Sequence, residues 1–284
     1  AIDGGLYVPE SWPIATPAIN GSYAELATSI FLPYLGGDVS NNTMLALSRD
    51  AYSTFRHPDV VPLVDLEPGH QLMELFHGPT LAFKDVALQL LGRLFDHILT
   101  QRNERVTIVG ATSGDTGSAA IDGVKNCDNV NIVILYPKGR VSDVQRRQMT
   151  TVDSPNVRTV AIDGTFDDCQ DLVKAMFNDA AFRERNNLSA VNSINWARVM
   201  AQVVYYFEIA RRVNGEFDVT VPTGNFGNVL SGWIAKQMGA PVRHLVVASN
   251  ENDILTRFFE SLAMTVTGVH PTLSPSMDIQ VSSN

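Results

Sequence analysis

Short runs of β-branched and other apolar residues recur along most of this chain and are separated by stretches with helical periodicity. The clearest runs cover residues 105–110, 131–136, 157–162, 218–222 and 244–248. Each run is continuously apolar rather than alternating, which is typical of strands covered on both faces. Strands that alternate with helices predict a parallel α/β architecture in two units, with ligands at the carboxyl ends of the strands.

One helix is predicted in detail after Asp163, where Thr165 is placed to cap it. The apolar residues that follow recur at helical spacing and predict one buried stripe. They are Cys169, Leu172, Val173, Met176 and Phe177. Residues 1–60 are instead rich in proline and glycine, and we interpret them as an N-terminal lobe.

The chain has 284 residues, 45% of them hydrophobic, which is enough for one large or two ordinary domains. No apolar run approaches the roughly 20 residues of a membrane span, and the first residues lack a signal-peptide pattern, so we expect no membrane and a cytoplasmic location. The net charge of -9 disfavours nucleic acid as a partner, because phosphate backbones need a basic surface. Cys127 and Cys169 form no metal-ligand pattern, so no metal is expected.

A lysine stands between a Gly-Pro turn and an apolar helical run in residues 76–85, which read FHGPTLAFKD. A lysine against an apolar wall loses hydration, which favours the neutral amine that acts as a nucleophile or forms a Schiff base. Lys84 is therefore our candidate for the chemistry, and a surface lysine at a helix start is the alternative. His77 is either a proton carrier or a structural residue of the turn.

Two loops of small residues follow predicted strands and open helices. The first reads ATSGDTGSAA at residues 111–120, and the second reads VPTGNFGNV at residues 221–229. Backbone N–H groups at such junctions can converge on an anion, helped by the helix N-terminus and by glycines that permit close approach. Ordinary turns that need glycine only for their geometry are the alternative.

A further block, VNSINWAR, covers residues 191–198 and leads into an apolar helix at 199–209. Asn and Ser before a helix are typical caps, and an arginine there is typically a surface charge. Arginine is also suited to a bidentate grip on phosphate or carboxylate. Asn192, Ser193 and Arg198 are therefore candidate ligands for an anion.

Together, and in the family's order along almost the whole chain, these blocks resemble the threonine synthase family of fold-type II pyridoxal-phosphate (PLP) enzymes. The resemblance implies that Lys84 carries PLP as a Schiff base and that Asp115, where many related enzymes have Asn, lies beside the ring. It implies a cradle for the cofactor phosphate formed by Gly224, Asn225, Phe226, Gly227 and Asn228. It implies substrate contacts by Thr112, Ser113, Thr116, Asn192, Ser193 and Arg198.

The resemblance also implies a fold like that of the tryptophan synthase β subunit, with two parallel-sheet α/β domains and an N-terminal lobe. The expected boundaries are 1–60 for the lobe, 61–92 and 190–284 for the large PLP-binding domain, and 93–189 for the small domain. The family continues beyond the equivalent of Asn284, so we expect a chain truncated at both ends with an incomplete large domain.

The implied reaction converts O-phospho-L-homoserine and water to L-threonine and phosphate, with PLP as the electron sink. Lys84 would first anchor the cofactor and then carry protons. A related serine or threonine dehydratase and a noncatalytic remnant of the fold are the alternatives. The expected partner is a small-molecule substrate, and the expected assembly is a monomer or a homodimer.

Overall fold

The computed structural model describes residues 7–17, 20–190 and 195–282. The chain divides into two compact units, one from residues 1–48 and 193–284 and the other from residues 49–192. Residues 61–92 therefore lie in the same unit as residues 93–189, because helix α3 (Asp85–Arg102) packs against helix α4 (Asp115–Val124). The expected three-part division stays a prediction.

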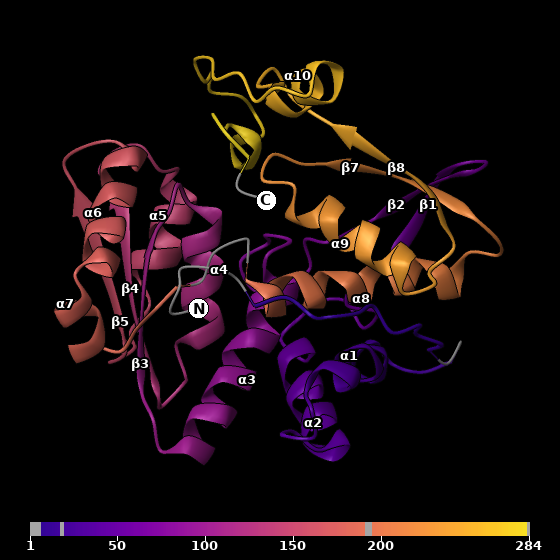
Figure 1. Ribbon diagram of the computed structural model, residues 1–284, viewed down its shortest axis with the longest axis horizontal. Coiled ribbons are helices and arrows are strands. Elements are labelled where there is room, and N and C mark those ends of the chain that lie inside the picture. Colours follow the sequence, from indigo (N-terminus) through magenta and orange to yellow (C-terminus); the bar gives the residue numbers. More distant parts are fainter. Residues whose placement is uncertain (1–6, 18–19, 191–194, 283–284) are drawn as a thin grey trace. The chain divides into compact units, whose positions relative to one another are not determined.

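The unit of residues 49–192 is built on a four-stranded parallel sheet with the order β5-β4-β3-β6. Its strands are β3 (Val106–Ala111), β4 (Val130–Pro137), β5 (Val157–Ile162) and β6 (Leu188–Ser189). The antiparallel hairpin of β1 (Leu63–Glu67) and β2 (His70–Met73) precedes α3. The further helices are α5 (Asp143–Thr150), α6 (Phe166–Asn178) and α7 (Ala180–Arg185), and Figure 1 shows α6 and α7 on one face of the sheet with α4 on the other.

The register of the sheet positions two segments that matter for the site. Strands β3 and β4 pair without a shift from Val106 and Val130 to Ala111 and Leu135. Because the strands are parallel, their carboxyl ends meet at one edge of the sheet. The loop that opens α4 and the segment that leads into α5 both leave from that edge.

Helix α6 confirms most of its prediction. The Thr165 hydroxyl accepts from the Asp168 backbone N–H at 3.2 Å, and the Asp168 carboxylate accepts from the Thr165 N–H at 2.7 Å. Buried Cys169 packs with Val109 of the sheet. Leu172 is 45% exposed, so its place in the buried stripe was predicted wrongly, because it lies at the edge of the helix face that meets the sheet.

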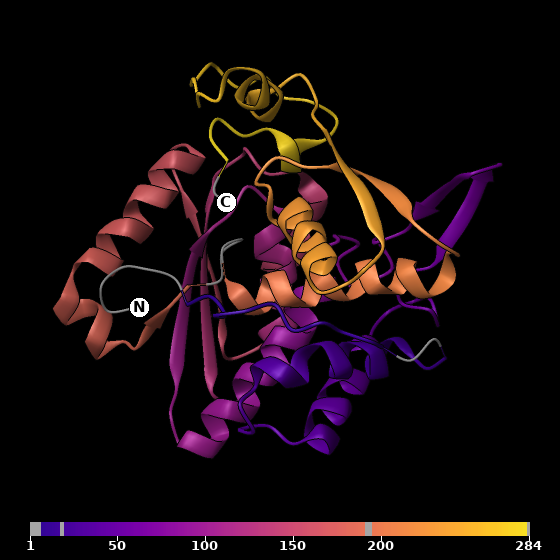
Figure 2. The same cartoon turned by 45° about the vertical axis from the view of Figure 1, so that its right-hand side comes forward.

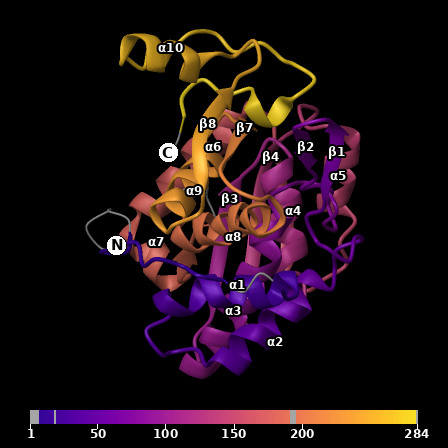
Figure 3. The same ribbon diagram turned by 90° about the vertical axis from the view of Figure 1, so that its right-hand side faces the viewer.

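The other unit contains a two-stranded parallel sheet of β7 (Phe217–Pro222) and β8 (Val242–Ala248). Its helices are α1 (Tyr23–Phe31), the 3-10 helix η1 (Leu32–Tyr34), the first part of α2 (Asn41–Tyr52), α8 (Trp196–Arg212), α9 (Gly227–Gln237), α10 (Ile254–Ser261) and the 3-10 helix η2 (Pro275–Met277). Figures 1 and 3 both show α8 between α1 and α9. That position explains why residues 198–209 of α8 are all buried.

The apolar runs predicted strands that are covered on both faces. Two of the strands are instead partly exposed. Val160 of β5 is 41% exposed because β5 is the outermost strand of its sheet. Val246 of β8 is 47% exposed, whereas the same sheet packs against α9. After β8 the chain passes through α10 and turns back, as Figure 2 shows in gold to yellow, and Asn250 Nδ2 there donates to Thr272 Oγ1 and Asp278 Oδ1, both at 2.8 Å.

Within residues 7–17, 20–190 and 195–282, no helix combines the length and the apolar character that a membrane span requires.

Candidate active site

Lys84 is the residue immediately before α3, and the turn ahead of it is tied to the start of that helix. The Asp85 carboxylate accepts from the Thr80 backbone N–H at 2.8 Å and from the Thr80 hydroxyl at 2.7 Å. Gly78 is required at this turn, because a Cβ there would lie 2.4 Å from the Asp85 side chain. The local sequence therefore fixes the backbone that carries Lys84.

The Lys84 amine lies against an acidic partner and an aromatic ring. Its Nζ is 3.0 Å from Asp115 Oδ2 and 5.2 Å from the centre of the Phe83 ring. The lysine side chain is 13% exposed and the aspartate side chain 21% exposed, so the pair is largely shielded from water. Lys84 is consequently not the solvated surface lysine of the alternative interpretation.

Asp115 is the first residue of α4 and follows Gly114, whose φ of 144° favours glycine. Thr112 builds this loop, because its hydroxyl oxygen accepts from the N–H groups of Gly114 at 3.0 Å and Gly117 at 2.9 Å. Ser113 is exposed and Thr116 is half-buried. Their hydroxyls are therefore more accessible to a ligand than that of buried Thr112.

Helix α5 supplies two residues that the sequence analysis missed. Gln145 Nε2 donates to Asp115 Oδ1, and Gln148 Nε2 donates to the Thr80 carbonyl at 2.9 Å. The two glutamines are three residues apart and therefore share a helix face. Gln145 thus holds Asp115, the partner of Lys84, and Gln148 holds the turn that precedes Lys84.

The loop of residues 224–228 belongs to the other unit and connects β7 to α9. Phe226 precedes the helix with φ at 64°, and no side chain within the described part of the chain caps α9. The first N–H groups of a helix have no partner within the helix, so an uncapped start is suited to an anion. A Cβ at Gly224 would lie 3.1 Å from Met277 Cα, which explains the glycine by close backbone approach.

Arg198 lies in the first turn of α8 and is only 3% exposed. Its Nε and Nη1 find no hydrogen-bond partner among the residues that the structure describes. Burial lowers the pKa of this guanidinium to about 10. Such a cation is costly without a counter-charge, so the position favours an anionic ligand.

The rest of the 191–198 block is described from residue 195 onward. Asn192 and Ser193 lie outside the described residues. Asn195, two residues later, caps α8 by accepting from the Arg198 N–H at 3.3 Å. His77 lies 2.7 Å from Glu74 Oε2 through its Nε2, a contact that fits a structural role at the turn.

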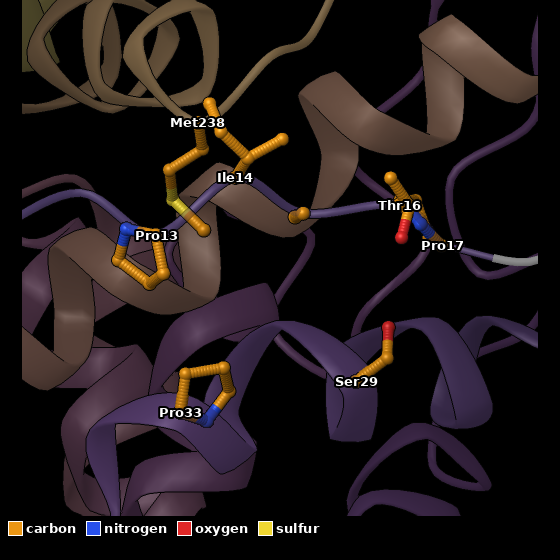
Figure 4. Close-up of a pocket in the computed structure, with 8 residues that line it drawn as sticks. Pro13, Ile14, Thr16, Pro17, Ser29, Pro33 and Met238 are labelled. Atoms are coloured by element: carbon orange, nitrogen blue, oxygen red, sulfur yellow. The ribbon is translucent and has the colours of Figure 1, made fainter.

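A small cavity of about 200 Å³ between the segment 13–17 and the α1–η1 region is lined by none of these residues. Figure 4 shows Ile14 and Met238 on one side of it and Ser29 and Pro33 on the other. Its lining carries no charged side chain, so it has nothing with which to neutralise an anion.

The family model described as pyridoxal-phosphate dependent enzyme matches residues 63–284, and the model for the threonine synthase N terminus matches residues 1–52. The chain therefore belongs to the pyridoxal-phosphate dependent enzymes. Threonine synthase from Pseudomonas aeruginosa is 52% identical over 100% of this chain and 62% of its own length. Within the family, this chain is accordingly a member of the threonine synthases.

Solved structures agree with this assignment. The PLP-bound threonine synthase from Brucella melitensis superimposes with a TM-score of 0.93 at 52% identity, over 99% of this chain and 62% of that one. Threonine synthase from Escherichia coli gives a TM-score of 0.87 at 34% identity, over 100% of this chain and 67% of that one. The chain spans about three fifths of the length of its curated relatives. The predicted fold class is confirmed.

Proposed function

We propose that the complete protein carrying this sequence is a threonine synthase that converts O-phospho-L-homoserine and water to L-threonine and phosphate. The observation that carries the proposal is the shielded pair of Lys84 and Asp115, 3.0 Å apart behind an anchored turn. The reaction balances without a further reactant, because one water is consumed and one phosphate leaves.

Pyridoxal 5'-phosphate, when bound, supplies an aldehyde that bonds to an amine and a ring that withdraws electrons from carbon. In each unit, taken by itself, the chemistry of the residues suits one end of this group. Lys84 is the amine that would bond to it, and Asp115 would lie beside the ring. The uncapped loop of Gly224, Asn225, Phe226, Gly227 and Asn228 offers backbone N–H groups for the phosphate.

The substrate carries its own phosphate and carboxylate, so it needs cationic or N–H partners besides those of the cofactor. Arg198 supports this requirement, because a buried guanidinium whose Nε and Nη1 have no partner among the described residues is suited to bind an anion strongly. We assign substrate contacts to Thr112, Ser113, Thr116, Asn192, Ser193 and Arg198. For Thr112 the contact would come through its hydroxyl proton, because its oxygen already accepts two backbone N–H groups.

Lys84 also has the position of a proton carrier. With its amine free, Lys84 donates to Asp115 Oδ2, which orients it. Gln145 in turn fixes the Asp115 carboxylate. Lys84, oriented in this way, would move protons at the substrate carbon atoms, while the burial of the site limits access of water.

We also propose a cytoplasmic location and a monomeric or homodimeric assembly, with a small molecule as the main partner. Size-exclusion chromatography with light scattering measures the assembly. A larger oligomer would contradict this part of the proposal.

The test is an assay of the complete protein with O-phospho-L-homoserine and PLP, in which phosphate and threonine are both measured. Equal amounts of phosphate and threonine are expected. Phosphate release without threonine, or dehydration of serine or threonine in its place, would contradict the synthase assignment. Borohydride reduction followed by peptide mass analysis should add the mass of the reduced cofactor to the Lys84 peptide, and an unmodified peptide would contradict PLP binding.

A further inference from the structure

Helix α8 carries a polar stripe along a buried face. Its members recur at positions i, i+4, i+7 and i+8, so they lie on one side of the helix. They are Arg198, Gln202, Tyr205 and Tyr206, with exposed fractions of 3%, 5%, 2% and 1%. Four buried polar side chains on one face of a helix cost free energy unless hydrogen bonds compensate them.

The two tyrosines direct their hydroxyls to a single residue, Asn228. Tyr205 Oη lies 2.6 Å and Tyr206 Oη lies 2.8 Å from Asn228 Oδ1, and both hydroxyls donate to it. Tyr206 Oη is also 2.9 Å from the Asn228 carbonyl oxygen. The α8 helix therefore holds both the side chain and the backbone of Asn228.

The same stripe continues toward the start of α8. Tyr205 Oη lies 3.3 Å from Gln202 Oε1, and Gln202 Nε2 donates to the Arg198 carbonyl at 3.2 Å. The Tyr205 hydroxyl has a single proton, so its 2.6 Å contact with Asn228 Oδ1 is the main hydrogen bond and the contact with Gln202 Oε1 is the weaker one. The Tyr205 and Tyr206 rings also pack against each other, with centroids 5.1 Å apart, which helps to keep both rings in place. The donors that reach Asn228 are thus preorganised.

Asn228 is the second residue of α9, within the helix start that we assign to the cofactor phosphate. An asparagine side chain has an acceptor end and a donor end, and only the donor end attracts an anion. With Oδ1 engaged by two hydroxyls, Nδ2 is the end left to donate. If the side chain rotated freely, its oxygen would face the anion part of the time and weaken binding.

We propose that Tyr205 and Tyr206 are positioning residues of the phosphate loop, which hold Asn228 so that its Nδ2 donates to the cofactor phosphate. The inference rests on the proposed function, because it takes residues 224–228 as the phosphate-binding loop. Neither tyrosine needs to touch the cofactor. Their effect should therefore be confined to the phosphate and should vanish when Asn228 is removed.

The test compares two ligands, pyridoxal 5'-phosphate and pyridoxal, by equilibrium titration of the complete apoprotein. Tyr205→Phe and Tyr206→Phe should each weaken PLP binding by roughly 2- to 10-fold, the range expected for one hydrogen bond. Pyridoxal, which lacks the phosphate, should bind each variant as it binds the parent. Tyr34→Phe is the matched control, because the Tyr34 hydroxyl in the same unit donates to Met238 Sδ instead, at 3.4 Å.

A second arm repeats the two substitutions in an Asn228→Ala background. Here neither substitution should weaken PLP binding any further, because the side chain that the tyrosines position is gone. The inference would be overturned if the substitutions left PLP affinity unchanged or weakened PLP and pyridoxal binding equally. It would also be overturned if they weakened PLP binding equally with and without the Asn228 side chain. Failure of the parent to prefer PLP over pyridoxal would instead overturn the phosphate loop of the proposed function, and this inference with it.

Discussion

The Asp85 carboxylate, which is fully buried, accepts both the backbone N–H and the hydroxyl of Thr80 at 2.8 and 2.7 Å. Burial raises the pKa of Asp85 from 3.8 to about 6, and the negative charges of Asp122 and Asp115 act in the same direction. The two bonds from Thr80 oppose this rise, because they stabilise the ionised form. The turn ahead of Lys84 is therefore held by a group that titrates near pH 6.

Asp85 should make the stability of the protein depend on pH. Below pH 3.8 the carboxyl is protonated in both the folded and the unfolded state, so its favourable contribution is complete. As the pH rises to about 6 the unfolded chain ionises while the folded one still holds its proton, so this contribution is lost. The change from 3.8 to about 6 corresponds to about 3 kcal/mol.

Asp85→Asn is the variant that removes this titration. The unfolding free energy of the parent minus that of the variant, measured by denaturant titration, should fall by up to about 3 kcal/mol between pH 4 and pH 7. Asp168→Asn is the control, because Asp168 is the exposed capping-box partner of Thr165, and hydrogen bonds from the Thr165 backbone and hydroxyl lower its pKa. Its contribution should change in the opposite direction with pH. A flat difference for Asp85→Asn would contradict the raised pKa.

Lys84→Ala should abolish turnover and the covalent attachment of the cofactor, because alanine has no amine that could bond to the aldehyde. Lys84→Arg keeps the positive charge beside Asp115 but cannot form that bond, since arginine stays protonated. Both variants should unfold within a few degrees of the parent in a thermal melt, roughly the effect of 1 kcal/mol or less. Full activity in either variant would rule out the role of Lys84.

Asp115→Asn should keep more activity than Asp115→Ala. The asparagine oxygen can still accept from Lys84, and Gln145 can turn its amide so that its own oxygen accepts from the new Nδ2. The alanine offers no acceptor to Lys84, so turnover should fall by about tenfold or more. Steady-state rates of threonine formation measure the difference. In an Asp115→Asn, Gln145→Leu double variant the advantage of asparagine should shrink, and its persistence would argue against the role of Gln145.

The sequence predicted those parts of the molecule that local patterns encode. Strands β3 and β4 follow from continuous apolar runs, and the start of α6 follows from Thr165 with Asp168 three residues on. Lys84 and the glycine loop at 224–227 stand out for the same reason, because a turn and a strand-to-helix junction have short-range signals.

Long-range contacts had no such signal. Gln145 and Gln148 reach partners 30 and 68 residues away, and nothing in a short polar helix says which side chains it will meet. Tyr205 and Tyr206 lie in an apolar run that predicts only a core helix. Their hydroxyls become informative once the fold brings Asn228 next to them. Residues that position others are thus harder to predict than residues that carry the chemistry.

Gly92 and Gly123 allow α3 and α4 to touch. A Cβ at Gly92 would lie 2.0 Å from the Gly123 carbonyl oxygen, and a Cβ at Gly123 would lie 2.5 Å from the Leu88 carbonyl oxygen. Because both obstacles are backbone atoms, Gly92→Ala and Gly123→Ala should each lower the unfolding free energy by about 1–3 kcal/mol. Gly268→Ala is the control, since no atom of the described residues lies within 4 Å of its Cβ position. Denaturant titration measures all three, and an unchanged stability of Gly92→Ala would contradict the close packing.

Arg198 should show a conflict between stability and binding. Its guanidinium is buried with Nε and Nη1 unpartnered among the described residues, so Arg198→Met replaces an uncompensated cation by an apolar side chain of similar length. The unfolding free energy should rise by about 1 kcal/mol or more. The KM for O-phospho-L-homoserine should increase by at least about tenfold, because an anion loses its charged donor, while PLP affinity stays as in the parent.

Arg211→Met, on the same helix, is the control for the effect of removing a buried arginine in general. It shows whether the stability and KM changes of Arg198→Met are specific to Arg198. The Arg211 guanidinium lies 2.5 Å from the fully buried Glu208 carboxylate, so its removal leaves a buried charge with one partner fewer. This variant should therefore lose stability, with little change in KM. Loss of stability in both variants would mean that Arg198 is a structural residue. A gain in Arg198→Met alone, together with the raised KM, would identify a cation held without a protein partner in order to bind the substrate.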